Sequence, residues 1–138
     1  MSDILKLARV QVLFLVVFVA LKAARRPLMD LSPPEWVGVF LYSFPNFAEA
    51  IIGMMTVTML LTAANHYLFS GRIKPAVIYL AATLISAVYV LTQEWGLHSL
   101  GGNNVFDIYD VYASVAGLVV ALAMLLVIRP EVKDPVAR

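Results

Sequence analysis

The chain has 138 residues, enough for one domain; 62% of them are hydrophobic and only 14% are charged. Soluble domains average about 45–50% apolar and about 25% charged residues, so this apolar surplus exceeds what one small soluble core buries. The formal net charge of +1 gives no strong field directed at nucleic acid, and the absence of cysteine excludes disulfides, thiolate metal sites and cysteine nucleophiles. The composition therefore predicts an integral membrane protein that does not bind nucleic acid.

Four apolar segments are long enough to cross a bilayer, whose hydrocarbon core needs about 20 apolar residues per helix. They span about 5–24, 47–69, 76–95 and 107–128. The first has Lys6 and Arg9 near its start and superficially resembles a signal peptide, but no small-residue cleavage site followed by a soluble domain appears, so we predict a retained helix. The predicted fold is an all-α four-helix transmembrane bundle, with 1–138 as a single domain.

The connections between these helices differ in character. Segment 25–35 is polar and contains three of the seven prolines, so we expect a loop. Segment 36–44, WVGVFLYSF, is apolar but only nine residues long, which is too short to span. We therefore predict a short interfacial or re-entrant segment after the first helix, ended by Pro45. The connections 70–74 and 96–106 are a basic turn and a polar loop with a Gly-Gly pair.

The distribution of Lys and Arg predicts the orientation, because cytoplasmic loops carry the excess. If the N-terminus is cytoplasmic, seven of these residues lie inside and three outside. The inner set is Lys6, Arg9, Arg72, Lys74, Arg129, Lys133 and Arg138, and the outer set is Lys22, Arg25 and Arg26. We predict a multi-pass protein of a bacterial inner membrane with both termini in the cytoplasm.

Polar side chains gather at the predicted outer ends of the second, third and fourth helices. Consecutive helices alternate in direction, so these ends share one membrane depth. The candidate cluster for a ligand or partner comprises Asn46, Glu49, Gln93, Glu94, His98, Asp107, Asp110 and Ser114. Ionisable residues at membrane depth are costly and commonly face the bundle interior. A purely structural alternative remains open, in which Asp107 is a helix N-cap, Asp110 a first-turn acid and Glu49 an interfacial side chain with access to water.

Small residues predict where helices pack closely. In the last helix Asp107, Asp110, Ser114, Gly117 and Ala121 recur at steps of three and four, which places them on one face. Gly53 in the second helix and Ser86 in the third are the corresponding candidates there.

The motifs of several chemistries are missing from the sequence. No metal-ligand spacing, nucleotide loop, helical zinc motif or serine elbow is present, so we predict no metal, no cofactor and no catalytic residue. Paired carboxylates alone are weak support for an enzyme. A transporter is also disfavoured, because no repeated halves with broken helices are visible.

Residues 93–117, QEWGLHSLGGNNVFDIYDVYASVAG, resemble the VanZ-like family of small bacterial membrane proteins. In that family a Gln or Glu closes one helix, a polar loop follows, and a D-x-x-D-x-x-x-N-x-x-G pattern opens the last helix. The matching residues are Gln93 or Glu94, Asp107, Asp110 and Gly117, with SFPNFAEA at 43–50 where the family has a second polar motif. Ser114 replaces the family's Asn, and Asn103 and Asn104 stand where the family has an Arg. The resemblance implies a cell-envelope protein, associated with glycopeptide resistance in some members, without a defined reaction.

The sequence is consistent with two functions. The first is a VanZ-like, non-catalytic membrane protein whose outward-facing acidic cluster binds an envelope lipid or a partner. The alternative is a small accessory subunit that packs within a larger complex of integral membrane subunits, for which Met54, Met55 and Met59 would offer adaptable apolar contacts.

Overall fold

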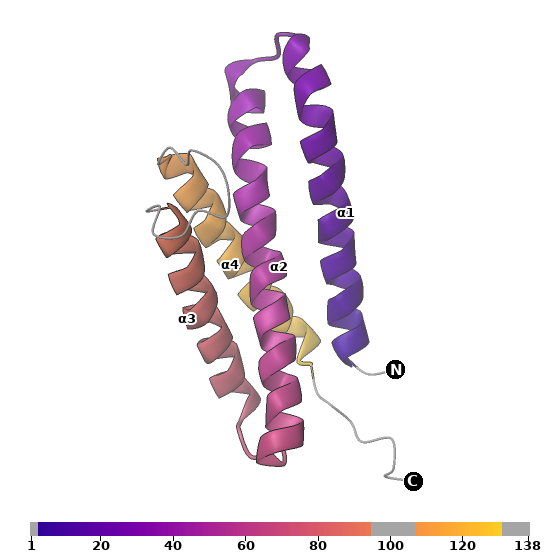
Figure 1. The fold of residues 1–138 in the computed structure, drawn as a ribbon, viewed down its shortest axis with the longest axis vertical. Coiled ribbons are helices and arrows are strands. Elements are labelled where there is room, and N and C mark those ends of the chain that lie inside the picture. The colour runs from indigo at the N-terminus through magenta and orange to yellow at the C-terminus, as the bar shows by residue number, and fades with distance from the viewer. Residues whose placement is uncertain (1–2, 95–106, 131–138) are drawn as a thin grey trace.

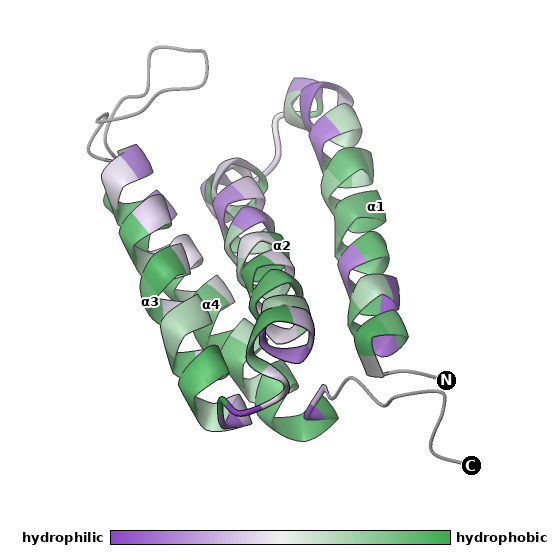
Figure 2. Cartoon of the chain, turned by 60° about the horizontal axis from the view of Figure 1, so that its bottom comes forward, coloured by the Kyte–Doolittle hydropathy of each residue, from purple (hydrophilic) through white to green (hydrophobic). Residues whose placement is uncertain are grey.

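The computed structural model describes residues 3–94 and 107–130, and these form helices joined by short connections. The helices are α1 (Asp3–Asp30), α2 (Glu35–Phe69), α3 (Pro75–Glu94) and α4 (Ile108–Ile128), shown in Figure 1. Each is long and apolar enough to cross a membrane. Hydrophobic residues run along all four in Figure 2, with hydrophilic colours mostly toward the helix ends. The predicted all-α, four-helix membrane bundle is confirmed.

α2 is the central element, because it packs extensively against each of the other three helices. Its contact with α4 is the most extensive, whereas α1 packs mainly on α2 and barely reaches α4. In Figure 1, α1 and α3 flank α2 on opposite sides and α4 crosses behind it. The loop 31–34, the end of α3 and the start of α4 lie at one end of the bundle, which we call the 31–34 end. The turn 70–74 marks the opposite, 70–74 end.

The connection between the first two helices is much shorter than predicted. α1 continues to Asp30 through Pro27, so the expected loop 25–35 shrinks to 31–34. A proline removes one helical N–H and crowds the preceding turn, but the residues around it can still hold the helix. Here the guanidinium of Arg25 lies over the Tyr42 ring, 4.7 Å from its centroid, and ties the end of α1 to α2.

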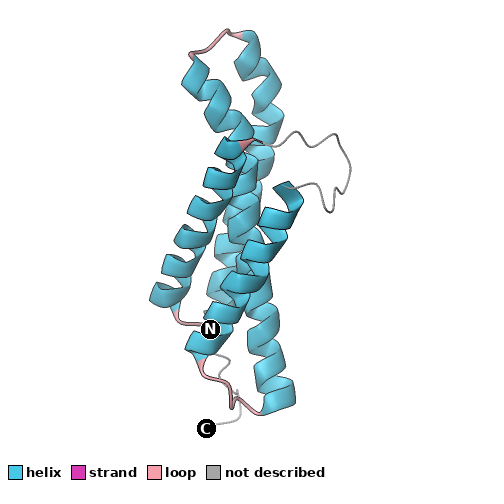
Figure 3. Ribbon diagram, turned by 90° about the vertical axis from the view of Figure 1, so that its left-hand side faces the viewer, coloured by secondary structure: helices cyan, strands magenta, loops and turns pink. Residues whose placement is uncertain are grey.

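The prediction of a separate segment at 36–44 is wrong. These residues form the first turns of α2, which continues through Pro45 to Phe69. At 1.5 Å per residue this 35-residue helix is about 52 Å long. The α1–α2 hairpin therefore extends past the ends of α3 and α4, as Figures 1 and 3 show.

The buried core lies along α2 and gathers side chains from all four helices. Its members are Leu7, Ala50, Ile51, Met54, Met55, Val90, Leu118, Ala121 and Leu125. At Gly117 the backbones of α4 and α2 lie close together, because a Cβ at this position would collide with the carbonyl oxygen of Phe47 and lie 3.0 Å from the Ala50 Cβ. Ser114 and Ala121, one turn to either side, are buried on the same face. We call this contact the α2–α4 seam.

Candidate functional site

Glu49 lies on the surface of α2 toward the 31–34 end, between α1 and α3. Gln93 at the end of α3 hydrogen-bonds its carboxylate, and Lys22 on α1 is close enough to attract it electrostatically. The Lys22 ammonium in turn lies 5.3 Å from the centroid of the Phe18 ring. Gln93 on α3 thus contacts Glu49 directly, and Lys22 on α1 acts on it through its charge. The sequence placed Glu49 and Gln93 at the same depth but gave Lys22 no role beyond its positive charge.

A groove of about 130 Å³ extends from Glu49 between α2 and α3. Its lining residues are Glu49, Ala50, Gly53, Val57, Ile85, Ser86, Tyr89 and Val90. The residues below Glu49 are mostly apolar, so the groove has a carboxyl group at one end and is hydrophobic along the rest of its length. We call it the Glu49 groove.

Two small residues, Gly53 and Ser86, give this groove open space and a buried hydroxyl. No atom lies within 4 Å of the position that a Cβ on Gly53 would take, so the prediction that Gly53 packs tightly against another helix is wrong. Its missing side chain leaves open space instead. Ser86 is only 4% exposed, and its Oγ has no hydrogen-bond partner among the described residues. A buried hydroxyl normally has a partner, so this atom is available to a bound molecule.

The acids of α4 have a different setting. Asp107 is the N-cap of α4, and its carboxylate accepts a hydrogen bond of 2.9 Å from the Tyr109 backbone N–H. Asp110 is half-buried in the first turn, where the helix dipole favours a negative charge. Both positions match the structural alternative considered from the sequence. Asn46 is half-buried on α2.

The remaining members of the predicted cluster fall outside what is described. Glu94 closes α3, but its side chain lies outside the described residues, as does all of His98. Across 3–94 and 107–130, no three His, Cys, Asp or Glu side chains gather in a way that could hold a metal ion.

Tyr109 belongs to a second, apolar cavity of about 300 Å³ between α2 and the start of α4. It is lined by Val39, Phe40, Ser43, Phe44, Phe47, Tyr109 and Ala113. Aromatic rings line most of its α2 wall, and the Phe44 and Phe47 centroids are 5.9 Å apart.

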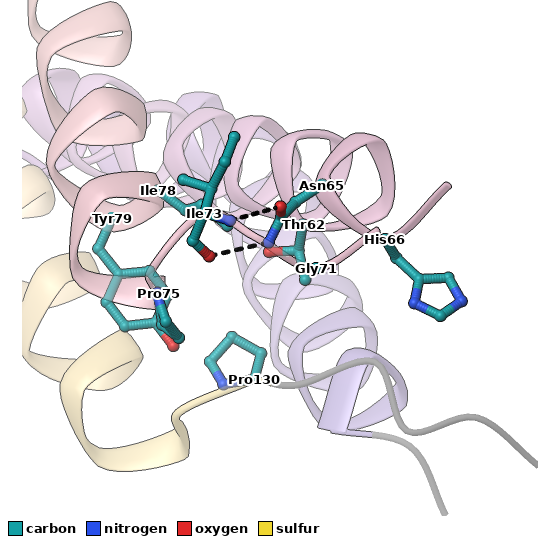
Figure 4. A pocket seen from close by; sticks show the side chains of 9 residues that line it. All are labelled: Thr62, Asn65, His66, Gly71, Ile73, Pro75, Ile78, Tyr79 and Pro130. Atoms are coloured by element: carbon teal, nitrogen blue, oxygen red, sulfur yellow. Dashed lines mark hydrogen bonds between the residues drawn. The ribbon is translucent and has the colours of Figure 1, made fainter. Parts of the chain in front are cut away.

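A third cavity, of about 230 Å³, lies at the 70–74 end and was not predicted (Figure 4). Asn65 closes it by a double contact: its Oδ1 accepts from the Ile73 N–H and its Nδ2 donates to the Ile73 carbonyl, both at 3.0 Å. Thr62 lines the same cavity with a buried Oγ1. His66 is also among the residues that line it. The signal in the sequence was an Asn within an apolar helix, but its partner in the following turn is apparent only in the fold.

A polar contact within the apolar spans joins α1 to α2. Gln11 of α1 donates from Nε2 to the Thr56 Oγ1, which in turn donates to the Ile52 carbonyl at 2.8 Å. Sequence analysis missed this pair, although an isolated Gln in the run VQVLFLVVF was a visible signal.

Comparison with protein-family models, curated proteins and solved structures finds no match for this chain. The geometry of the Glu49 groove therefore carries the functional argument.

Proposed function

We propose that this chain is a VanZ-like, non-catalytic protein of a bacterial inner membrane that binds an envelope lipid through the Glu49 groove. One observation carries the proposal: a carboxylate at the edge of the membrane-spanning region opens into a mostly apolar groove between two helices. A lipid has this same combination of a polar head and an apolar chain.

The depth of Glu49 supports a headgroup site. α3 has 20 residues and is about 30 Å long, which equals the thickness of a bilayer hydrocarbon core. Gln93, at the end of α3, therefore lies at the boundary between hydrocarbon and headgroups. Glu49 lies at the same depth because Gln93 hydrogen-bonds it.

The proposed orientation places the 31–34 end outside and both termini in the cytoplasm. The excess of Lys and Arg near the opposite end supports it. A reporter fused after Arg138 should be active only as a cytoplasmic fusion. Activity of the fusion in the periplasm would reverse the orientation and place the Glu49 groove in the inner leaflet.

The proposal is tested by native mass spectrometry of the full chain extracted gently from its membrane. We expect bound phospholipid on the wild type and a large loss of it in Gly53→Leu, because the added side chain fills the groove. Ala123→Leu is the matched control, since Ala123 is exposed on α4 away from the groove and also gains bulk. Equal lipid retention in all three proteins would contradict the proposal.

A second candidate, an accessory subunit of a membrane complex, has its own supporting observation. α2 is about 52 Å long against a core of about 30 Å, and its first turns expose Trp36 (70%) and Phe40 (50%). Exposed aromatics beyond the core suit an interfacial belt or a protein partner. Co-purification of other subunits in fixed ratio, lost in Trp36→Ala with Phe40→Ala but retained in Gly53→Leu, would favour this function.

A further inference from the structure

The two ends of the Glu49 groove, one charged and one apolar, restrict the kind of lipid that fits. We infer that the groove binds a phospholipid with a primary ammonium headgroup, such as phosphatidylethanolamine. This inference rests on the proposed function and names the ligand class of the same site.

The charged groups at the groove's entrance suit a zwitterion. Glu49 presents an exposed carboxyl group, and Lys22 on α1 acts on it with a positive charge. A headgroup ammonium placed on the Glu49 carboxylate would bring its phosphate within the field of Lys22. A headgroup that carries only negative charge would be repelled by the Glu49 carboxylate.

Hydrogen bonding distinguishes a primary ammonium from a quaternary one. A primary ammonium has three N–H donors, and the Glu49 carboxylate and the Gln93 side-chain oxygen are acceptors. A trimethylated ammonium has no N–H to donate. The same charge therefore binds less tightly when it is carried by choline.

Ser86 supplies an independent observation deeper in the groove. Its Oγ is buried, lines the groove and has no hydrogen-bond partner among the residues described. Ser86 lies seven residues before Gln93 on α3, about 10 Å further into the membrane. The ester oxygens of a phospholipid lie below its phosphate and are acceptors, so they suit this hydroxyl.

The rest of the groove suits an acyl chain. Val57, Ile85 and Val90 provide apolar walls, and the open space at Gly53 lets a chain approach the α2 backbone. The lipid thus lies along the groove with its ammonium at Glu49, an ester at Ser86 and one chain between α2 and α3.

The test exchanges the purified full-length protein into nanodiscs holding equal amounts of phosphatidylethanolamine, phosphatidylcholine and phosphatidylglycerol. Lipids retained on the protein after gentle release are counted by native mass spectrometry. We expect the ethanolamine lipid to exceed the glycerol lipid by about fivefold, the factor for one close charge pair in a water-like setting. It should exceed the choline lipid by a similar factor of about five, the factor for one net hydrogen bond from its N–H donors. Glu49→Gln should remove this preference while lipid is still bound, and Ser86→Ala should lower retention of all three lipids.

Glu35→Gln is the control, because Glu35 is an exposed carboxylate at the start of the same helix but outside the groove. It should leave the preference unchanged. Equal retention of the glycerol and ethanolamine lipids by the wild type, with lipid still lost in Gly53→Leu, would overturn the ammonium assignment and leave lipid binding intact. Failure of Gly53→Leu to lose lipid would overturn both.

Discussion

The α2–α4 seam and the Glu49 groove both contain a glycine of a membrane-spanning helix, yet the two glycines have opposite surroundings. At Gly117 an added Cβ would collide with the Phe47 backbone, whereas at Gly53 nothing lies within 4 Å. Small residues let helices approach, but approach requires a neighbour that fills the space. One glycine therefore holds two helices together, and the other keeps a groove open.

The largest effect is expected at the seam. Gly117→Ala should destabilise the bundle by at least about 1–3 kcal/mol, because the new methyl group meets a backbone carbonyl that cannot rotate away. Thermal unfolding in detergent, followed by circular dichroism, measures the change. Gly53→Ala is the matched control, and we expect it to be neutral or to stabilise by up to about 1 kcal/mol through helix propensity. Equal destabilisation by both would remove the distinction between seam and groove.

Asn65 is expected to have the next largest effect, at the far end of α2. Asn65→Ala removes both hydrogen bonds to Ile73 and should cost about 1–3 kcal/mol, since it leaves backbone groups of the turn without partners. Hydrogen exchange at the Ile73 N–H should accelerate in parallel. Asn65→Asp keeps the acceptor oxygen, so it should preserve more of that protection; protection as low as in the Ala variant would contradict the assigned contact.

The Gln11–Thr56 contact should contribute less. Hydrogen bonds between membrane helices contribute about 0.6 kcal/mol on average and up to about 1.7 kcal/mol. Gln11→Leu should therefore weaken the packing of α1 on α2 by a free energy in this range. A double-mutant cycle with Thr56→Val isolates the pair. Strictly additive effects of the two substitutions would show that the contact contributes nothing to the attachment of α1.

Asp107 should have a similar or smaller effect, confined to the start of α4. Asp107→Ala loses the cap on the Tyr109 N–H and should cost about 1 kcal/mol, while Asp107→Asn retains an acceptor and should stay close to the wild type. The unfolding midpoints of the three proteins test this. If Asn is as damaging as Ala, the charge of Asp107 has a role beyond capping.

The sequence was informative wherever a local pattern decides the structure. Four apolar runs of sufficient length predict four membrane-spanning helices, because an isolated backbone in hydrocarbon must satisfy its own hydrogen bonds. The alternation of helix direction likewise predicts that Glu49 and Gln93 share one depth. Neither result needs knowledge of side-chain packing.

The predictions from the sequence failed where contacts with other helices or turns determine the local structure. Prolines at 27 and 45 suggested breaks, but packing of the α1–α2 hairpin maintains helix through both positions. Gly53 and Gly117 look alike in the sequence, and only the placement of α4 separates them. Lys22 and Asn65 likewise find their partners on other elements, which periodicity along one helix does not reveal.

Photo-crosslinking in nanodiscs tests the central claim most directly. The probe is phosphatidylethanolamine with a diazirine in one acyl chain, and labelled peptides are mapped by mass spectrometry. We predict labels concentrated at residues 53–57 of α2 and 85–90 of α3, and their loss in Gly53→Leu. Labels spread over the lipid-facing sides of α1 and α4, with none enriched at these two segments, would contradict a lipid in the Glu49 groove.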